Sequence, residues 1–409
     1  MISRSPIFTL LIALFSIGLV AALVLHPEAS FQAALRGLNI WWEVVFPALL
    51  PFIVLSEILM GVGVVHFVGV LLEPLMRPLF NVPGTGGFVM TMGFSSGYPV
   101  AAKITTSLRE KGHITRAEGE RLVSFATTGD PLFVIGAVAV GFFHSEQLGF
   151  TLALTHYLSA ILIGLFYRYH AAGDLITKPI PRNKLPLLFR ALQAMHRARV
   201  NDGRPFGRLM GEAVHSALQT LLMVGGFLIV FSVMIQLLAA LNITQLLSTS
   251  ITILLSPFDL PPQFSKALIS GLFEVTLGAQ AASEVPGQIS LMWKAAVASS
   301  IISWGGLSVH AQVASILSKT DIRFLPYLFA RFFHAFLAGI LTLLFWRPLT
   351  QMTEGLVESR PVFQIWDQPR MIHAWTDSLT HNGMIATLIL IVLIAASLFI
   401  YRSVFRSPR

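Results

Sequence analysis

The chain has 409 residues, of which 55% are apolar and only 12% are charged, and its mean hydropathy is +0.73. Soluble globular proteins carry about 25% charged residues, so this composition excludes an ordinary soluble enzyme and indicates a membrane protein. The net charge of +8 is then more typical of basic cytoplasmic loops than of nucleic-acid binding, and the lack of cysteine excludes disulfides, thiolate metal sites and cysteine nucleophiles.

Eight apolar segments are predicted to cross the membrane, because a spanning helix needs about 20 mostly apolar residues. Six of them are continuous, at 7–25, 44–62, 148–167, 212–240, 324–346 and 384–402. Two more are interrupted by small and polar residues, at 122–143 and 291–317. The first segment lacks a convincing signal-peptide cleavage site, so we expect it to be retained as a helix. Two further stretches, 63–80 and 243–256, are expected to lie at the membrane interface.

The distribution of Lys and Arg predicts that both termini are cytoplasmic. Basic residues gather in 103–121, in 168–208 and in the C-terminal tail, whereas 347–383 has more acidic than basic residues. These preferences agree only if 82–106 and 265–288 enter the membrane and return on the same side. We therefore expect two re-entrant hairpins, which open to opposite sides. The alternative is two ordinary kinked helices packed through small residues.

The two halves of the chain follow the same order of segments, which predicts an internal repeat. Phe80-Asn81-Val82-Pro83 aligns with Phe258-Asp259-Leu260-Pro261 at an offset of 178 residues. We expect 44–143 and 215–320 to be repeats of opposite orientation, an arrangement that is typical of secondary transporters. The predicted fold class is an all-α polytopic membrane protein with two inverted repeats and re-entrant helical hairpins.

Each repeat contains two polar breaks in an apolar context, one in the hairpin and one in the helix after it. Hydrocarbon cannot satisfy the free backbone groups of a broken helix, so such breaks should line a buried or wet cavity. Helix N-termini at the breaks would favour an anion. We expect the four breaks to form one binding site between the repeats. Its candidate residues are Ser95, Ser96, Gly97, Tyr98, Lys103, Thr127, Thr128, Glu274, Thr276, Gln280, Ser308, His310 and Gln312.

A charge at membrane depth is costly and is a functional candidate by default. The residues concerned are the acids Glu57, Glu274 and Glu284, expected to be buried or half-buried, and the bases Lys294 and Arg331. Glu274 is the best candidate for a coupling-ion or proton site, because burial favours a protonated carboxyl group; the alternative is a hydrogen-bonded structural carboxylate. Lys294 has the alternative of extending its ammonium group to the outer interface. For Arg331 the alternatives are contact with an anion and structural pairing with another helix.

Three runs of residues resemble the YlbJ family of sporulation integral membrane proteins, also called SpoVV. They are Phe94-Ser95-Ser96-Gly97-Tyr98-Pro99 with Ala102-Lys103, the segment 131–138, and the segment 305–312. The resemblance covers roughly residues 1–345. It implies two nucleoside-recognition (Gate) domains and a fold similar to concentrative nucleoside transporters. It also implies transport of dipicolinic acid, a small anion, from the mother cell across the outer forespore membrane, so that the chain is a multi-pass cell-membrane protein.

A site for dipicolinate needs hydrogen-bond donors and an apolar or aromatic slot, since the molecule is a flat ring with two carboxylates. The partners expected are this anion and the lipid bilayer, with no nucleic acid, cofactor or metal. The sequence leaves open which ion, if any, drives transport and whether the chain forms a homo-oligomer.

Functions other than transport of dipicolinate are also compatible with parts of the sequence. The same fold would suit a nucleoside or another organic anion, and a non-transporting scaffold in spore-envelope assembly is the alternative outside transport. Gly93-Phe94-Ser95-Ser96-Gly97 formally matches the hydrolase motif G-x-S-x-G. An intramembrane serine peptidase would need a histidine beside Ser95 or Ser96, and His156 and His310 are available by type. An apolar hairpin is the wrong context for that motif, so we expect no enzyme.

The chain is accordingly divided into six regions. They are an N-terminal helix and connector (1–43), a first Gate-like repeat with the following helix (44–167), a basic cytoplasmic loop (168–211), a second Gate-like repeat with the following helix (212–346), a polar loop (347–383) and a C-terminal helix with a basic tail (384–409).

Overall fold

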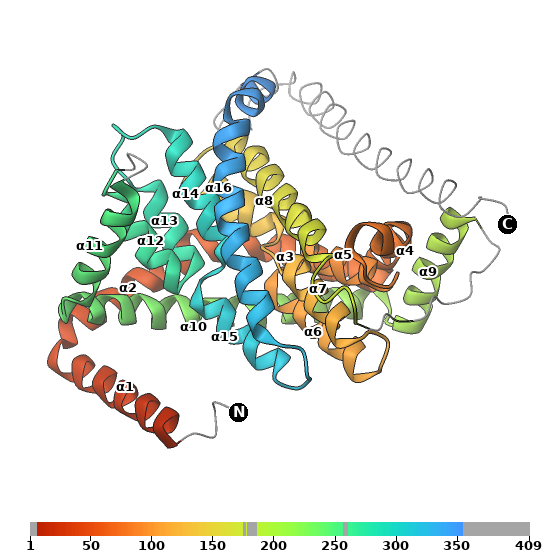
Figure 1. Cartoon of the computed structure of the whole chain (residues 1–409), viewed down its shortest axis with the longest axis horizontal. Helices are drawn as coiled ribbons and strands as arrows, with labels where there is room; N and C mark the ends of the chain where they lie inside the picture. The colour runs from red at the N-terminus through yellow and green to blue at the C-terminus, as the bar shows by residue number, and fades with distance from the viewer. Residues whose placement is uncertain (1–5, 175–176, 178–185, 257–260, 355–409) are drawn as a thin grey trace.

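The computed structural model describes residues 6–174, 177, 186–256 and 261–354, and all regular elements in these ranges are helical. The prediction of an all-α protein is therefore confirmed for this part of the chain. The expected helix 384–402, the basic tail, most of the loop 347–383 and residues 258–260 of the repeat alignment lie outside the described residues. Figure 1 shows α10 (Phe206–Ala240) running along the molecule and α16 (Phe324–Glu354) crossing it.

The same order of elements occurs in both halves: a long helix, a peripheral helix, a helical hairpin, a broken helix and a second long helix. The first half contains α3 (Phe46–Val62), α4 (Val64–Leu75), α5 (Gly86–Ser96), α6 (Tyr98–Glu110), α7 (Arg116–Ala126), the π-helix η4 (Leu132–Phe142) and α8 (Glu146–Tyr167). The second half contains α10, α11 (Ile243–Leu255), α12 (Phe264–Phe273), α13 (Val275–Ser283), α14 (Leu291–Trp304), α15 (Gly306–Leu317) and α16. The opposite orientation of the halves and the re-entry of the hairpins stay predictions.

Four helical stretches of the described chain are long and apolar enough to span a membrane. They are Pro27–Val62, Glu146–Tyr167, Phe206–Ala240 and Phe324–Thr350. They contain four of the six continuous segments expected from the sequence. A fifth segment forms α1 (Pro6–Leu25), whose part Ser16–Leu25 is a shorter apolar helix. The two interrupted segments are each split into two helices, as their small and polar residues predict.

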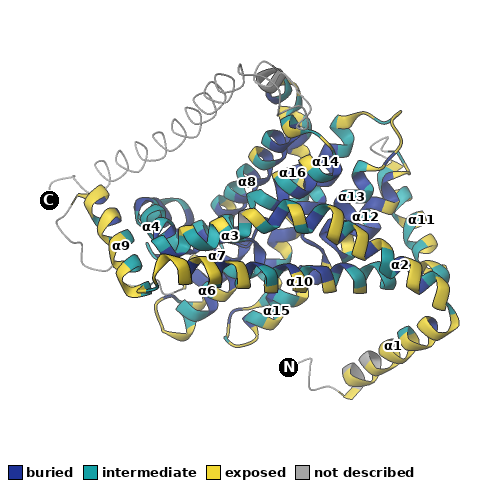
Figure 2. Cartoon of the chain, turned by 180° about the vertical axis from the view of Figure 1, so that it is seen from behind, coloured by how far each residue is buried: buried dark blue, intermediate teal, exposed yellow. Residues whose placement is uncertain are grey.

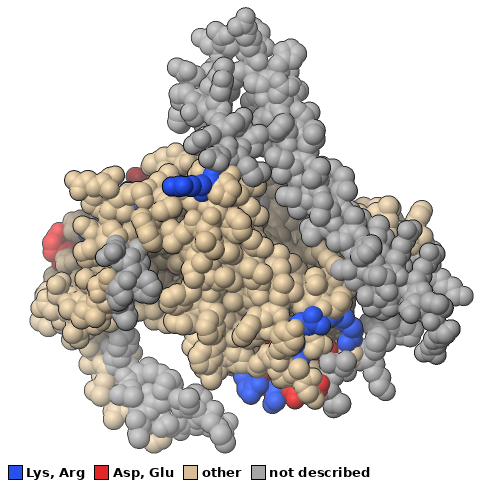
Figure 3. All heavy atoms as spheres, turned by 45° about the horizontal axis from the view of Figure 1, so that its top comes forward, with Lys and Arg blue, Asp and Glu red and all other residues tan. Residues whose placement is uncertain are grey.

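The described surface on the face shown in Figure 3 is largely uncharged, as expected for helices that face lipid. Lys, Arg, Asp and Glu occupy only small areas of the described surface in Figure 3. On α16, for example, Phe332, Phe336 and Ile340 are exposed. Figure 2 shows the buried residues concentrated between the helices of the main body, whereas the described residues of α1 are mostly exposed.

Helix α10 lies against the continuous helix formed by α2 (Pro27–Ile40), the π-helical turn η2 (Trp41–Val45) and α3. Trp41 Nε1 donates a hydrogen bond of 2.8 Å to the carbonyl oxygen of Leu221. A Cβ atom built on Gly225 would lie 2.8 Å from the Trp41 side chain. The indole therefore fits only against a glycine, and this contact fixes the register between the two long helices.

The basic loop 168–211 is not a loop throughout, because it contains the helix α9 (Leu187–Asp202). Leu187 and Ala191, four residues apart, are buried in one cluster with Leu71 of α4. Arg190 forms an ion pair of 2.5 Å with Glu73 of α4. This segment thus forms a helix because its few apolar residues pack against an apolar surface of α4. The π-helix η3 (Met76–Phe80) follows α4 in the chain.

Both hairpins are packed through small residues. In the hairpin of α12 and α13, a Cβ atom on Gly278 would lie 2.2 Å from the Cα atom of Gly271. In the hairpin of α5 and α6, a Cβ atom on Gly93 would lie 2.8 Å from the Cβ atom of Ala101. The arms of the second hairpin are therefore in backbone contact, and those of the first approach so closely that a side chain larger than glycine does not fit at position 93.

We expect Gly278→Ala to lower the free energy of unfolding by about 1–3 kcal/mol, because the added methyl group would force the arms of the hairpin apart. Thermal unfolding of the detergent-purified protein measures this loss. Gly226→Ala is the matched control, since Gly226 lies in α10 with no atom within 4 Å of its built Cβ. An equal melting temperature for both variants would contradict the close packing.

Candidate functional site

Four interruptions of the helices define the site, and we call the place where they meet the junction. Gly97, with φ of +84°, separates α5 from α6. Residues 127–131 separate α7 from η4, and the extended residue Glu274 separates α12 from α13. Gly305 and Gly306, with φ of +90° and +80°, separate α14 from α15. Only glycine adopts such positive φ values without strain.

Tyr98 brings three of the four breaks together. Its hydroxyl group donates a hydrogen bond of 2.5 Å to the carbonyl oxygen of Ile302, near the end of α14. A Cβ atom on Gly129 would lie 3.0 Å from this hydroxyl oxygen, and one on Gly305 would lie 3.3 Å from the ring. The first hairpin thus contacts the broken helices of both halves.

The fourth break joins the junction through Gly306. A Cβ atom on Gly306 would lie 3.0 Å from the carbonyl oxygen of Phe273 and 3.1 Å from the backbone of Glu274. The tip of the second hairpin therefore rests on the break between α14 and α15. The prediction that the four breaks meet is confirmed.

Two carboxylates at the junction cap the helices that follow them. Asp130 Oδ1 accepts hydrogen bonds from the backbone N–H groups of Leu132 and Phe133, at 3.0 and 2.8 Å. Glu274 accepts from the N–H group of Leu277 at 2.8 Å and from the hydroxyl group of Thr276 at 3.2 Å. An acceptor at a helix N-terminus stabilises the free N–H groups there. Glu274 therefore has a structural role, whichever functional role it also has.

A buried histidine connects the two halves beside the junction. His156 of α8 forms hydrogen bonds through Nε2 to Thr128 Oγ1, at 2.5 Å, and through Nδ1 to Ser303 Oγ, at 2.8 Å. The next residue, Tyr157, donates from its hydroxyl group to the carbonyl oxygen of Gly129 at 2.9 Å. The sequence singled out His156 only as a possible peptidase base, because one histidine in an apolar helix carries no motif.

Among the described residues, the serine side chains of the first hairpin have no histidine partner. Ser95 donates to the carbonyl oxygen of Met92 and lies 3.4 Å from Ser96, whose hydroxyl group faces the sulfur of Met60. His156 is engaged as described, and His310 Nδ1 is 3.1 Å from the hydroxyl oxygen of Tyr327. The arrangement gives no support to a serine peptidase.

The other predicted residues fall into three groups according to their burial. Thr127, Thr128, Glu274, Thr276, Ser308 and His310 are buried at or next to the breaks. Gln280 and Gln312 are half-buried on α13 and α15, further along each helix from its break. Lys103 is exposed on α6 and so lies outside the buried junction. Lys294 donates to the carbonyl oxygens of Val285 and Ser283, as expected for a lysine that reaches the end of its membrane segment.

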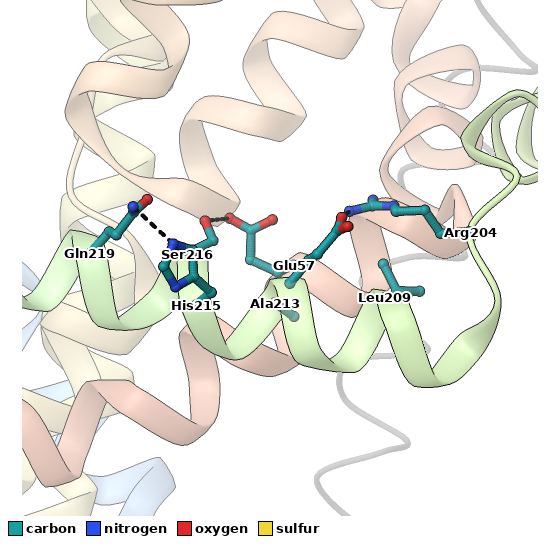
Figure 4. Close-up of a pocket in the computed structure, with 8 residues that line it drawn as sticks. Glu57, Arg204, Leu209, Ala213, His215, Ser216 and Gln219 are labelled. Carbon is teal, nitrogen blue, oxygen red and sulfur yellow. Dashed lines mark hydrogen bonds and ion pairs between the residues drawn. The ribbon is translucent and has the colours of Figure 1, made fainter.

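Two surface pockets lie away from the junction. One, of about 320 Å³, is formed between α3 and α10 and contains Glu57 and Ser216, which are joined by a hydrogen bond of 2.8 Å (Figure 4). Its Arg204 is already paired with Asp202 and Glu212. The other, of about 420 Å³, lies between the end of α8 and the start of α16. The arginine of the first pocket is thus neutralised within the protein, so that pocket offers no free guanidinium group to an anion.

One end of the bundle is held by ion pairs between the halves. Glu120 of α7 is fully buried and forms hydrogen bonds with Arg323 at 2.7 and 2.8 Å and with His170 at 2.7 Å. Burial alone would raise the pKa of Glu120, but the hydrogen bonds from Arg323 and His170 outweigh it and hold the pKa below its usual value. At the same end, Arg109 forms a bidentate pair with Asp321 at 2.8 Å. These contacts bring Arg109, Glu120, His170, Asp321 and Arg323 to the same end of the bundle, while the side of the membrane that this end faces stays a prediction.

We expect Arg323→Gln to lower the free energy of unfolding by about 2 kcal/mol, because it leaves the buried carboxylate of Glu120 with fewer charged donors. Asp321→Asn should cost less than about 1 kcal/mol, since its pair with Arg109 is partly exposed. Thermal unfolding of both variants in detergent gives the comparison. A larger loss for Asp321→Asn would show that the Glu120 contact is not the stronger one.

The chain is similar in sequence to a protein family model and to a curated protein, and in structure to a solved protein. The Gate family model, described as nucleoside recognition, matches residues 42–168, from η2 to the end of α8. The sporulation integral membrane protein YlbJ of Bacillus subtilis (strain 168) is 49% identical over 348 residues, which are 84% of each chain. The resemblance identified in the sequence is thereby confirmed. A solved structure of CNTnw in an inward-facing substrate-bound state aligns with a TM-score of 0.45 and 14% identity, over 84% of this chain and 87% of that one.

Proposed function

The chain belongs to the family of the sporulation integral membrane protein YlbJ, and we propose that it transports dipicolinic acid across a membrane during sporulation. It is an integral membrane protein with several candidate spans. The route we propose leads from the mother cell across the outer forespore membrane, with both chain termini in the cytoplasm. Residues 44–167 and 212–346 would be the two transport repeats, in opposite orientation and each with a re-entrant hairpin.

The junction is the observation that carries this proposal. Four helix breaks from both halves meet in the interior of an apolar bundle and bring hydroxyl, imidazole and phenol groups with them. A scaffold has no need for interrupted backbone at this depth, whereas a carrier uses it to contact its cargo. The donors at the junction match the carboxylates of dipicolinate, and the rings of Tyr98 and Tyr157 match its flat ring.

A nucleoside is the second candidate cargo. The match of 42–168 to a model described as nucleoside recognition favours it. A nucleoside has an uncharged sugar and an uncharged base, so its binding would not need a positively charged side chain inside the helix bundle. The two cargoes are therefore separable by experiment.

We expect proteoliposomes that contain the purified protein to take up labelled dipicolinate saturably, and not uridine, when compared with empty vesicles. Uptake is measured with and without a proton or sodium gradient, which shows whether transport is coupled to an ion, the role for which Glu274 is the candidate.

Tyr98→Phe removes the hydroxyl group that joins the first hairpin to Ile302. We expect this variant to lower uptake about tenfold, because it loses one hydrogen bond of about 1.4 kcal/mol. Tyr169→Phe is the control, because Tyr169 is exposed.

The outcomes separate the three functions. Saturable uptake of dipicolinate alone supports the proposal. Uptake of uridine instead would assign the chain to the nucleoside carriers. No uptake of either cargo by a correctly folded protein would overturn transport in favour of the scaffold.

A further inference from the structure

Two arginines of the described chain are fully buried, Arg121 and Arg331. Every side-chain nitrogen of Arg121 donates to a backbone carbonyl oxygen, whereas two nitrogens of Arg331 have no partner. Arg331 of α16 has no exposed surface, although its neighbours Phe329 and Phe332 are exposed on the outer side of the same helix. The cation therefore points inward, away from lipid and water. A buried guanidinium group is costly unless a negative charge and hydrogen-bond acceptors compensate it.

The protein compensates this charge only in part. Arg331 Nη2 donates a hydrogen bond of 2.6 Å to the carbonyl oxygen of Ser124, in the last turn of α7. The negative end of a helix dipole is equivalent to about half a charge at most. Arg331 Nε and Nη1 have no hydrogen-bond partner, and no Asp or Glu of the described chain forms an ion pair with Arg331.

The surroundings of Arg331 are aromatic and uncharged rather than acidic. Its Cζ atom lies 5.9 Å from the ring centroid of Tyr327. Tyr327 and Tyr98 belong to one buried cluster, and the hydroxyl oxygen of Tyr327 lies 3.1 Å from His310 Nδ1. Tyr98 and His310 both lie next to helix breaks, so the ring that Arg331 contacts is packed against the junction.

Unpartnered polar atoms are concentrated in the same region. The described residues contain ten buried side-chain nitrogen or oxygen atoms without a hydrogen-bond partner. Half of them are two atoms of Arg331 and one each of His310, His334 and Thr127. Because buried polar groups are nearly always paired in native proteins, such a cluster indicates a place where a ligand supplies the partner.

We propose that Arg331 binds a carboxylate of the carried anion, and that the site therefore takes aromatic carboxylates and not uncharged nucleosides. The carboxylate accepts hydrogen bonds from the free N–H groups of Arg331 and neutralises its charge. The rings of Tyr98 and Tyr327 lie beside a planar aromatic ligand. This inference rests on the proposed function as far as transport is concerned, but it makes its own prediction about binding.

The first test is the stability of the ligand-free protein. If Arg331 only held helices together, Arg331→Met would lower the melting temperature. For an uncompensated charge we expect an equal or higher melting temperature, because an apolar side chain of similar length is cheaper to bury. Arg347→Met is the control, since Arg347 is an exposed arginine of the same helix.

The second test is binding of dipicolinate, benzoate and uridine to the detergent-purified protein by isothermal titration calorimetry. We expect Arg331→Met to weaken dipicolinate binding about 100-fold, as for the loss of one partner of a buried charge pair. Arg331→Lys keeps the charge without the planar fork and should weaken binding about tenfold. Arg347→Met should bind as the wild type does.

The tests distinguish failure of the inference from failure of the proposed function. Two results would overturn the anion site without affecting the proposed uptake of dipicolinate by the wild type. One is an Arg331→Met variant that binds dipicolinate within threefold of the wild-type affinity. The other is a clear loss of stability of this variant without ligand. Binding of benzoate through Arg331 without uptake of dipicolinate would support the anion site and show that the cargo is another carboxylate. Wild-type protein that binds neither carboxylate would overturn the inference.

Discussion

The structure depends on one constraint: a helix that is broken inside an apolar bundle has backbone groups that lipid cannot satisfy. The chain meets this constraint by bringing the breaks together. Tyr98 satisfies a carbonyl group near the end of α14, Tyr157 satisfies Gly129, and Glu274 caps the helix that begins after it. The contact of Tyr98 joins one half of the chain to the other, so the polar interior also holds the two halves together. If the halves move relative to each other during transport, the groups that would contact the cargo must move as well.

Two buried charges illustrate how differently the protein treats structure and the proposed binding site. Glu120 has no exposed surface and is surrounded by donors, since Arg323 and His170 both bind it. Arg331 is equally buried but has one carbonyl partner and no carboxylate in the described chain. The cost of removing a buried charge from water is recovered at least in part when the charge has partners, and is not recovered when it has none. A costly arrangement such as the uncompensated charge of Arg331 persists where function requires it. It therefore favours a ligand-binding role of the protein over a scaffold role.

The long and the broken helices could be predicted from the sequence, because both depend on local composition. Runs of apolar residues define the four long helices, and the glycine, proline and hydroxyl residues inside 122–143 and 291–317 mark the interruptions. Helix α9 could not, since its few apolar residues become a helical face only against α4. His156 was missed as a site residue for a similar reason: its partner Ser303 lies 147 residues away, and no local pattern predicts that contact.

The contact between α7 and α16 connects the proposed anion site to the ion pairs at the end of the bundle. Arg323, directly before α16, binds Glu120, and Arg331, eight residues later, binds the carbonyl group of Ser124, four residues after Glu120. Both contacts join the first half of the chain to the second. A carboxylate that binds the free Nε and Nη1 groups of Arg331 shares its guanidinium group with the carbonyl group that ends α7. A movement of the halves that shifts α7 against α16 would therefore also shift the group that binds the anion, so that binding of the anion and movement of the halves are physically coupled.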